Sequence, residues 1–196
     1  MGSEHRIVPA RRVCVSLYSL PPDLPAPVDD GACDHLVGLD VPALALDSSQ
    51  GPVDLAELGA NRAALYIYPR TGRPDREIPA TWDAIPGARG CTPQSCGFRD
   101  HAAELAERGA LVAGLSSQPL DDQRELAERL HMPFPVVADP DMAVGAALGL
   151  PTFEFEGVAL YKRVTLILEH GRIAKVFYPV FPPDANAQEV LTWLDS

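Results

Sequence analysis

The chain has 196 residues, of which 46% are hydrophobic and 22% are charged, and its formal net charge is −11 at pH 7. This composition is ordinary for a globular protein with one substantial core and excludes a disordered chain. The acidic balance argues against nucleic acid and anionic membrane as partners, because both are polyanions. No apolar run approaches the roughly 20 residues that a membrane-spanning helix needs.

The sequence contains four cysteines, Cys14, Cys33, Cys91 and Cys96. No clear secretory signal precedes them, so we expect a cytoplasmic protein. In a reducing compartment, four cysteines in a chain of this length do not indicate a disulfide scaffold, and any disulfide is expected to be transient. Cys14 and Cys33 lack partners at a spacing typical of zinc sites. We therefore expect no metal and no other cofactor, and interpret these two as unpaired thiols.

Residues 1–38 are rich in proline, aspartate and glycine, which indicates an extended, turn-broken extension that wraps the domain. From residue 39 onward, short apolar runs alternate with helical patterns. Strands are predicted at 43–46, 63–68, 111–115, 134–138, 164–168 and 173–177, the last two joined as a hairpin, and helices at 54–58, 91–108, 120–130, 142–148 and 186–194.

This order of elements predicts a three-layer α/β domain over residues 39–196, with a mixed sheet between two layers of helices. Between Pro69 and Cys91 lies a polar segment with three prolines and four arginines. We predict a long surface loop at 70–90. Loops of such length inside compact domains are usually functional or mobile.

The chemistry of the chain centres on residues 90–97, with the sequence GCTPQSCG. Pro93 suits the first turn of a helix, which places Cys91 at the helix N-terminus. Unpaired backbone N–H groups and the positive end of the helix dipole favour a negative charge there, and therefore a thiolate. The alternative is a small buried side chain, since free cysteine is among the most buried residue types. This stretch alone does not separate the two.

A cysteine at the start of the helix after the first long central strand resembles the thioredoxin-like fold. Residues 91–100, CTPQSCGFRD, are similar to the CTxExCxFRD signature of the bacterioferritin-comigratory, or Q-type, peroxiredoxins. Four more stretches resemble motifs of the same family in the same order, at 66–69, 114–116, 133–139 and 163–167. The five motifs together cover about residues 38 to 195.

The resemblance implies a thiol peroxidase that reduces hydrogen peroxide and organic hydroperoxides and is recycled by thioredoxin or a glutaredoxin-like dithiol. It implies that Cys91 attacks the peroxide, becomes a sulfenic acid, and is resolved by Cys96 through an intramolecular disulfide. Arg163 matches the family's arginine, which would stabilise the thiolate and orient the peroxide. We expect a monomer or a homodimer. Arg99 and Asp100 are expected to form a structural ion pair.

Helix geometry places a constraint on this scheme. On an ideal helix, residues five apart have Cα atoms roughly 8.6 Å apart, whereas a disulfide needs less than about 7 Å. If Cys91 and Cys96 are both helical in the reduced protein, forming their disulfide must unwind the turn between them. Gly90 and Gly97, on either side, are expected to ease this unwinding.

The sequence departs from the family pattern P-x-x-x-T/S-x-x-C. Ala84 and Ala88 occupy the proline and hydroxyl positions, and the matching strand-end proline, Pro69, lies 22 positions before Cys91 instead of 7, an insertion of 15 residues. We therefore expect Thr71 or Thr81 to hydrogen-bond the thiolate, or the loop to supply backbone donors.

Two further differences concern charge near the cysteine. Gln94 replaces the family's usual glutamate, which keeps an acceptor but removes the ion pair with an arginine. The loop arginines are expected either to add positive potential near Cys91 or to be solvated; they are Arg70, Arg73, Arg76 and Arg89.

Two other functions would use the same cysteines. One is a redox-sensing or regulatory binding protein in which Cys91 and Cys96 form a switch. The other is a thiol–disulfide oxidoreductase, which normally uses C-x-x-C at this helix start, so the spacing here argues against it.

Overall fold

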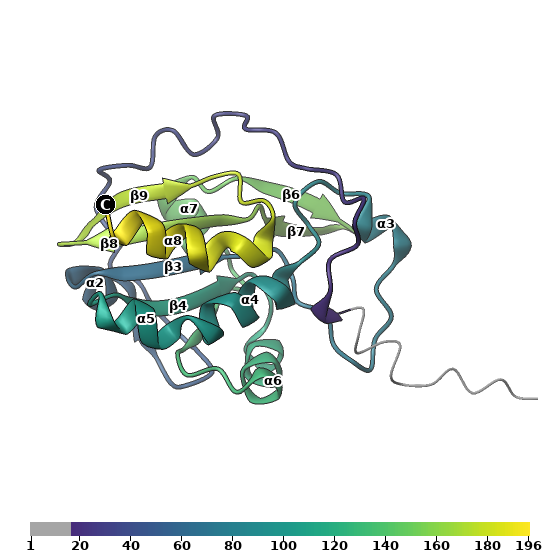
Figure 1. Ribbon diagram of the computed structural model, residues 1–196, viewed down its shortest axis with the longest axis horizontal. Helices are drawn as coiled ribbons and strands as arrows, with labels where there is room; N and C mark the ends of the chain where they lie inside the picture. Colours follow the sequence, from purple (N-terminus) through teal and green to yellow (C-terminus); the bar gives the residue numbers. More distant parts are fainter. Residues whose placement is uncertain (1–16) are drawn as a thin grey trace, which may run out of the picture.

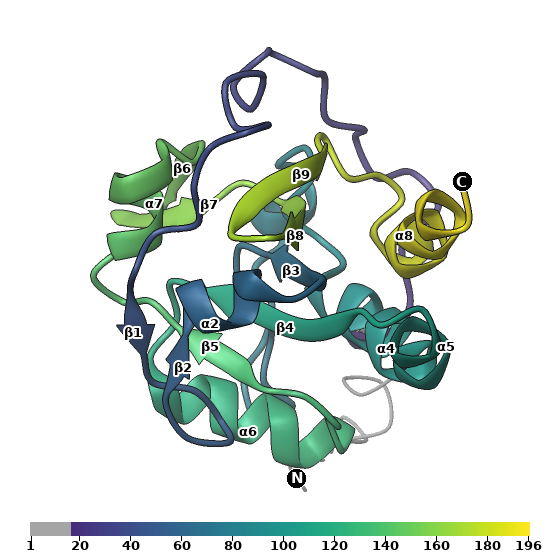
Figure 2. The same cartoon turned by 90° about the vertical axis from the view of Figure 1, so that its left-hand side faces the viewer.

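The computed structural model describes residues 17–196, so Cys14 lies outside the described residues. Its centre is a five-stranded sheet in the order β5-β4-β3-β8-β9, with helices on both faces (Figures 1 and 2). The strands are β3 (Ala63–Ile67), β4 (Leu111–Ser116), β5 (Val136–Ala138), β8 (Val164–Glu169) and β9 (Arg172–Phe177). The predicted three-layer α/β, thioredoxin-like fold is confirmed.

The sheet is mixed, as the sequence predicts. β4 runs parallel to β3 and β5, whereas β8 runs antiparallel to β3 and β9. All five residues of β3 are buried, because both of its faces are covered by other layers. The β8–β9 hairpin turns through His170 (φ 52°) and Gly171 (φ 77°), which confirms the predicted hairpin.

Two hydrophobic clusters hold the layers together, one on each face of the sheet. Helices α4, α6 and α8 contribute to one cluster, and α2 and α7 to the other. The predicted helix over 91–108 is in fact two, because His101 leaves the helical dihedrals (φ −98°, ψ 8°). The helices are α2 (Leu55–Ala60), α4 (Cys91–Asp100), α5 (Ala102–Glu107), α6 (Leu120–Leu130), α7 (Ala143–Leu148), α8 (Asn186–Leu194) and the 3₁₀ turn η1 (Pro183–Ala185).

Two small hairpins stand outside the main sheet. One pairs β1 (Ala45–Leu46) with β2 (Val53–Asp54), and the other pairs β6 (Thr152–Phe155) with β7 (Val158–Tyr161). The sequence did not predict the second, because exposed and partly buried residues alternate in β6 without a continuous apolar run. No helix in the described part of the chain is long and apolar enough to span a membrane.

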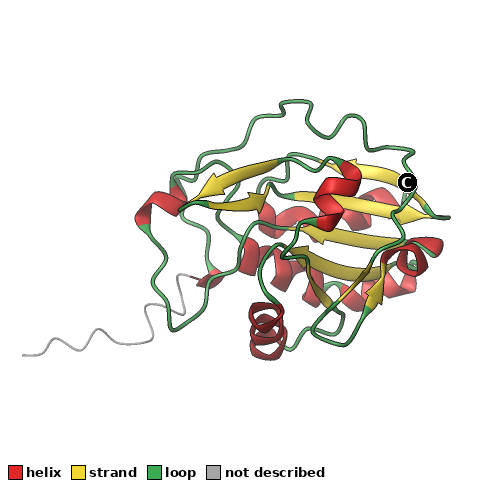
Figure 3. Cartoon of the chain, turned by 180° about the vertical axis from the view of Figure 1, so that it is seen from behind, coloured by secondary structure: helices red, strands yellow, loops and turns green. Residues whose placement is uncertain are grey.

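The segment 70–90 is mostly loop, as predicted, and residues 74–77 are exposed. It includes a short helix, α3 (Ala80–Asp83), beside the β6–β7 hairpin (Figure 3). Trp82 is buried and packs edge-on against Phe155, with ring centroids 4.9 Å apart. The Arg70 guanidinium lies 4.9 Å from the centroid of the Trp82 ring. These aromatic contacts attach α3 to the hairpin, which the polar composition of the segment did not indicate.

The described part of the N-terminal extension runs over the domain as extended chain and turns (Figure 1). Its Asp30 carboxylate accepts hydrogen bonds from Lys162 Nζ at 2.6 Å and Tyr178 Oη at 2.8 Å. These two donors lower the pKa of Asp30 to about 2. Leu36 is fully buried in the core beneath. The extension is therefore attached to the domain by packing and by charge.

Candidate active site

Three chain segments meet where β3 ends. Ile67 pairs with Val164 in the antiparallel register, so Arg163, immediately before β8, lies beside this end of β3. Helix α4 starts here with Cys91 as its first residue. Gly90 before it has φ 101°, and a Cβ there would lie 2.3 Å from Pro183 Cγ, so only glycine fits. The prediction that Cys91 begins a helix is confirmed.

The Cys91 sulfur lies against a buried guanidinium. Arg163 Nη2 is 3.2 Å from Cys91 Sγ, and each residue is only 3% exposed. The same Nη2 donates to the carbonyl oxygens of Gly87, Ala88 and Arg89 at 3.2, 3.1 and 3.1 Å. In its protonated form, Cys91 Sγ donates to the Ala88 carbonyl at 3.5 Å. The end of the inserted segment thus wraps around the guanidinium and presents it to the sulfur.

The Cys91 sulfur lies next to the positive charge of Arg163. Within residues 17–196, no carboxylate hydrogen-bonds to Arg163, whose hydrogen-bond partners are neutral oxygens apart from the Cys91 sulfur. Arginine does not lose its proton in proteins, and an unpaired buried charge is strongly unfavourable. Two opposite charges attract by about 4 kcal/mol at 4 Å and an effective dielectric of 20. The contact therefore places a permanent positive charge directly against the Cys91 sulfur.

Gln94 connects this pair to the rest of the fold. Its Oε1 accepts a hydrogen bond from Arg163 Nη1, and its Nε2 donates to Asn186 Oδ1 at 2.9 Å. Thr165 Oγ1 donates to the same Asn186 oxygen at 2.6 Å. Gln94, Thr165 and Asn186 are all fully buried. The donor–acceptor pattern fixes which way the Gln94 amide points, so its oxygen faces the arginine as a neutral acceptor.

Sequence reasoning singled out Gln94 but missed Asn186 and Thr165. Asn186 is 92 residues from Gln94 and begins α8, whereas Thr165 is part of β8. Thr165 lies within the 163–167 motif but was assigned no role, and Asn186 was marked only by its position at the start of a predicted helix. That position suggests a capping residue, not a partner of the site.

Cys91 opens onto a small crevice of about 20 Å³. Its walls come from the start of α4, from the inserted segment and from the first described residues of the chain. The lining residues are Leu17, Arg70, Gly72, Ile78, Trp82, Arg89, Gly90, Cys91, Thr92 and Pro93. A crevice of this size holds about one water-sized group.

Two of the four loop arginines, Arg70 and Arg89, line the crevice, and Arg89 also pairs with Asp83 at 3.2 Å. Arg73 donates to Asp122 at 3.0 Å, and it lines a separate cavity of about 350 Å³ together with Arg70 and Arg76. Two of the four arginines are therefore placed to add positive potential beside Cys91.

Thr71 lies on the wall of that separate cavity and not on the crevice. Its backbone N and its Oγ1 both donate to Gln118 Oε1, at 2.8 and 3.1 Å. Thr81 is exposed. Among the described residues, neither hydroxyl is hydrogen-bonded to Cys91, and the loop groups nearest to the sulfur are carbonyl acceptors. A catalytic role for Thr71 stays a prediction, while its observed contacts anchor the start of the loop near α6.

Cys96 lies in the same continuous helix as Cys91, and both thiols are free. Burial raises the pKa of Cys96, partly offset by the positive charges of Arg99 and Arg129. Arg99 also pairs with Asp100 at 2.7 Å, as the sequence predicts. The Cys96 side chain is thus a thiol at neutral pH.

Cys33 lies apart from this site, in the cluster on the other face of the sheet. Burial raises its pKa to about 12, with smaller contributions from nearby aspartates. Such a thiol is unreactive at neutral pH.

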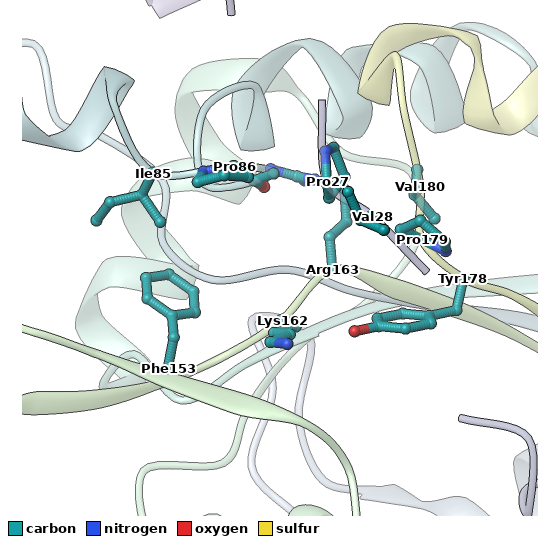
Figure 4. Close-up of a pocket in the computed structure, with 11 residues that line it drawn as sticks. Pro27, Val28, Ile85, Pro86, Phe153, Lys162, Arg163, Tyr178, Pro179 and Val180 are labelled. Carbon is teal, nitrogen blue, oxygen red and sulfur yellow. The ribbon is translucent and has the colours of Figure 1, made fainter. Parts of the chain in front are cut away.

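A larger cavity of about 220 Å³ lies on the other side of Arg163 (Figure 4). The extension supplies Pro27 and Val28 to its walls, and the β9–η1 connection supplies Tyr178 to Val180. Arg163 Nε is buried without a hydrogen-bond partner among the described residues. This side of the arginine is therefore held by apolar packing, in contrast to the Nη groups.

Comparison with known proteins identifies the family and the fold. Residues 36–191 match the redoxin family. The chain belongs to this family. This redoxin is 27% identical to the chloroplastic peroxiredoxin Q of Sedum lineare, over 81% of its own length and 77% of the relative's.

Two solved structures show the same fold. Peroxidoxin BcpB from Mycobacterium tuberculosis superposes with a TM-score of 0.65 at 27% identity, covering 82% of the redoxin and 97% of that chain. Peroxiredoxin Q from Xanthomonas campestris gives a TM-score of 0.62 at 21% identity, covering 88% and 97%. The resemblance to Q-type peroxiredoxins predicted from the five motifs is confirmed.

The raised pKa of Cys96 predicts its alkylation profile. An acid with a raised pKa stays neutral to higher pH, so the thiolate of Cys96 should form only above the range of an ordinary thiol. Iodoacetamide labelling across pH, with peptides resolved by mass spectrometry, should give Cys96 a higher midpoint in the folded protein than in urea. A folded-state midpoint at or below the unfolded one would contradict the assignment. Shielding of the side chain lowers the labelling rate at every pH, whereas a raised pKa moves the pH midpoint of labelling. The comparison of the two midpoints therefore reports on ionisation.

Proposed function

We propose that this redoxin is a thiol peroxidase that reduces hydrogen peroxide and organic hydroperoxides. The observation that carries the proposal is the 3.2 Å contact between Arg163 Nη2 and Cys91 Sγ at the start of α4. A nucleophilic thiolate needs a stabilising positive charge and an open side. Arg163 provides the charge, and the crevice over Cys91 provides the opening. The similarity to named peroxiredoxins supports the same reaction.

In the first step, the Cys91 thiolate attacks the terminal oxygen of the peroxide. An S–O bond forms as the O–O bond breaks, the sulfur is oxidised by two electrons, and the leaving oxygen takes a proton to become water or an alcohol. Negative charge moves from sulfur to the leaving oxygen. Arg163 N–H groups lie beside this path and stabilise the charge as it develops.

In the second step, Cys96 resolves the sulfenic acid. Its sulfur attacks Cys91, the S–S bond forms as the S–O bond breaks, and water leaves with the Cys96 proton. The continuous helix holds the two Cα atoms roughly 8.6 Å apart on ideal geometry, beyond the reach of a disulfide. The first turn of α4 must therefore unwind. Phe98 limits this change, because its ring is fully buried and stacks on Tyr66 with centroids 4.4 Å apart.

The cycle closes when an external dithiol reduces the Cys91–Cys96 disulfide. We propose thioredoxin or a glutaredoxin-like protein for this step, acting in the cytoplasm on a monomer or homodimer. A reducing compartment keeps such a disulfide transient.

A redox-regulated binding protein is the second candidate. The first turn of α4 is packed against η1 and α8, through Gly90 against Pro183 and through the Gln94–Asn186 hydrogen bond. Unwinding this turn would alter those contacts and so could signal oxidation to a partner. Turnover separates the two functions, because a sensor does not consume peroxide continuously with a dithiol donor.

The peroxidase proposal is tested by cysteine substitutions. Cys91→Ser should abolish peroxide consumption coupled to thioredoxin oxidation, because no other described cysteine lies beside Arg163. Cys33→Ser is the matched control and should keep the wild-type rate. Mass spectrometry of the peroxide-treated wild type should find a Cys91–Cys96 linked peptide. Peroxide removal by Cys91→Ser at the wild-type rate, or a link to Cys33 instead, would overturn the scheme.

The role of Arg163 predicts a loss confined to one step. Arg163→Ala should slow the reaction of Cys91 with hydrogen peroxide by about a hundredfold to a thousandfold, the usual effect of removing a transition-state donor. Reduction of the preformed disulfide by thioredoxin should change far less. Arg172→Ala, which removes an exposed arginine paired with Asp40, serves as control. Equal losses in both steps would show that Arg163 is structural only.

A further inference from the structure

The first described residues of the chain lie directly over the start of α4 (Figure 1). Leu17 is only 3% exposed and lines the crevice together with Cys91. A Cβ added to Gly72 would lie 2.6 Å from Leu17 Cδ2, and one added to Gly90 would lie 2.8 Å from Leu20 Cδ2. These two leucines therefore press against the backbone on both sides of the crevice.

A single arginine of α6 ties this segment to the inserted loop. Arg129 Nη1 donates to Tyr18 Oη at 3.3 Å, and Arg129 Nη2 donates to the Gly72 carbonyl at 3.2 Å. The guanidinium is itself held by Glu125, at 2.7 Å from Nε. Leu17 is thus positioned by its neighbour Tyr18 at the point where the loop and the helix approach each other.

The opposite wall of the crevice is less free to move. Trp82 is held by ring contacts with Phe155 and Phe153, at centroid distances of 4.9 and 6.0 Å, and by the Arg70 guanidinium. Leu17, in contrast, is an aliphatic side chain packed beside Gly72. Of the two apolar walls, the Leu17 side is the one that a larger substrate would displace.

The remaining room suits a small peroxide. The crevice of about 20 Å³ takes roughly one water-sized group. Hydrogen peroxide consists of two oxygen atoms and needs little beyond this space and the open rim. A hydroperoxide with a branched or aromatic carbon skeleton must push Leu17 out of its buried position. Expelling a buried leucine into water opposes binding.

We propose that Leu17 is a specificity-determining residue that closes the Cys91 crevice to bulky organic hydroperoxides while admitting hydrogen peroxide. This inference rests on the proposed peroxidase function and narrows its substrate class. The N-terminal extension thereby forms part of the substrate site in addition to packing on the surface of the domain.

Substitution of Leu17 in the full chain tests the proposal. Leu17→Ala should raise the ratio of kcat/KM for cumene hydroperoxide to that for hydrogen peroxide by about tenfold, the effect typical of a changed apolar pocket. Leu17→Met preserves side-chain volume and should keep the wild-type ratio. Leu24→Ala, a partly buried leucine of the same extension that does not line the crevice, should also keep it. An unchanged ratio in Leu17→Ala, or an equal rise in Leu24→Ala, would overturn the proposal.

A second readout does not depend on peroxidase activity. Cys91 is alkylated with a bulky aromatic maleimide and with the small reagent iodoacetamide, and both rates are followed by peptide mass spectrometry. The ratio of the maleimide rate to the iodoacetamide rate should rise about tenfold in Leu17→Ala. If the proteins lack peroxidase activity but show this size effect, the proposed function fails and the role of Leu17 stands. If peroxidase activity is present and neither size comparison changes, the role of Leu17 fails alone. Thermal unfolding of each variant verifies that it is folded.

Discussion

The site depends on one constraint, the burial of the Arg163 guanidinium without a carboxylate partner among residues 17–196. Three consecutive backbone carbonyls and the Gln94 amide oxygen satisfy its Nη donors, but none of them carries a charge. The Cys91 sulfur is the adjacent group that can become negative. The folded protein therefore holds a permanent positive charge against the Cys91 sulfur. Cys96, whose pKa is raised by burial, lies five residues away in the same helix. One helix thus carries both cysteines that the proposed peroxidase cycle uses.

Helix α4 meets two opposing requirements. Its first turn must be fixed to hold Cys91 against Arg163, and Gly90, packed on Pro183, and the Gln94–Asn186 bond provide that rigidity. In the proposed resolution step, the same turn must unwind for Cys96 to reach Cys91. The glycines expected to ease unwinding have packing roles in the reduced state: a Cβ on Gly97 would lie 3.2 Å from the Asp184 carbonyl oxygen. Opening the turn therefore means separating α4 from η1 as well as breaking helical hydrogen bonds.

Much of this was accessible from the sequence, because periodic apolar runs report burial directly. The central strands, the β8–β9 hairpin and the position of Cys91 were predicted correctly. The segment 70–90 is mostly loop, as predicted, with residues 74–77 exposed, but its composition gave no sign that Trp82, Ala88 and Arg89 are buried. Contacts between distant residues, such as Gln94 with Asn186, leave no local pattern. The contact of Leu17 with the Cys91 crevice is also a contact between distant residues. An isolated leucine in a proline-rich extension gives no indication of what it will pack against.

The central claim is that Cys91, held beside Arg163, is the atom that peroxide oxidises. Its most direct test is to treat the full-length Cys96→Ser variant with one equivalent of hydrogen peroxide in the presence of dimedone, which traps sulfenic acids, and to locate the adduct by peptide mass spectrometry. The account predicts a dimedone adduct on Cys91, formed in proportion to the peroxide consumed. An adduct on Cys33 or Cys14 with Cys91 unmodified, or peroxide consumption without any adduct on Cys91, would contradict it.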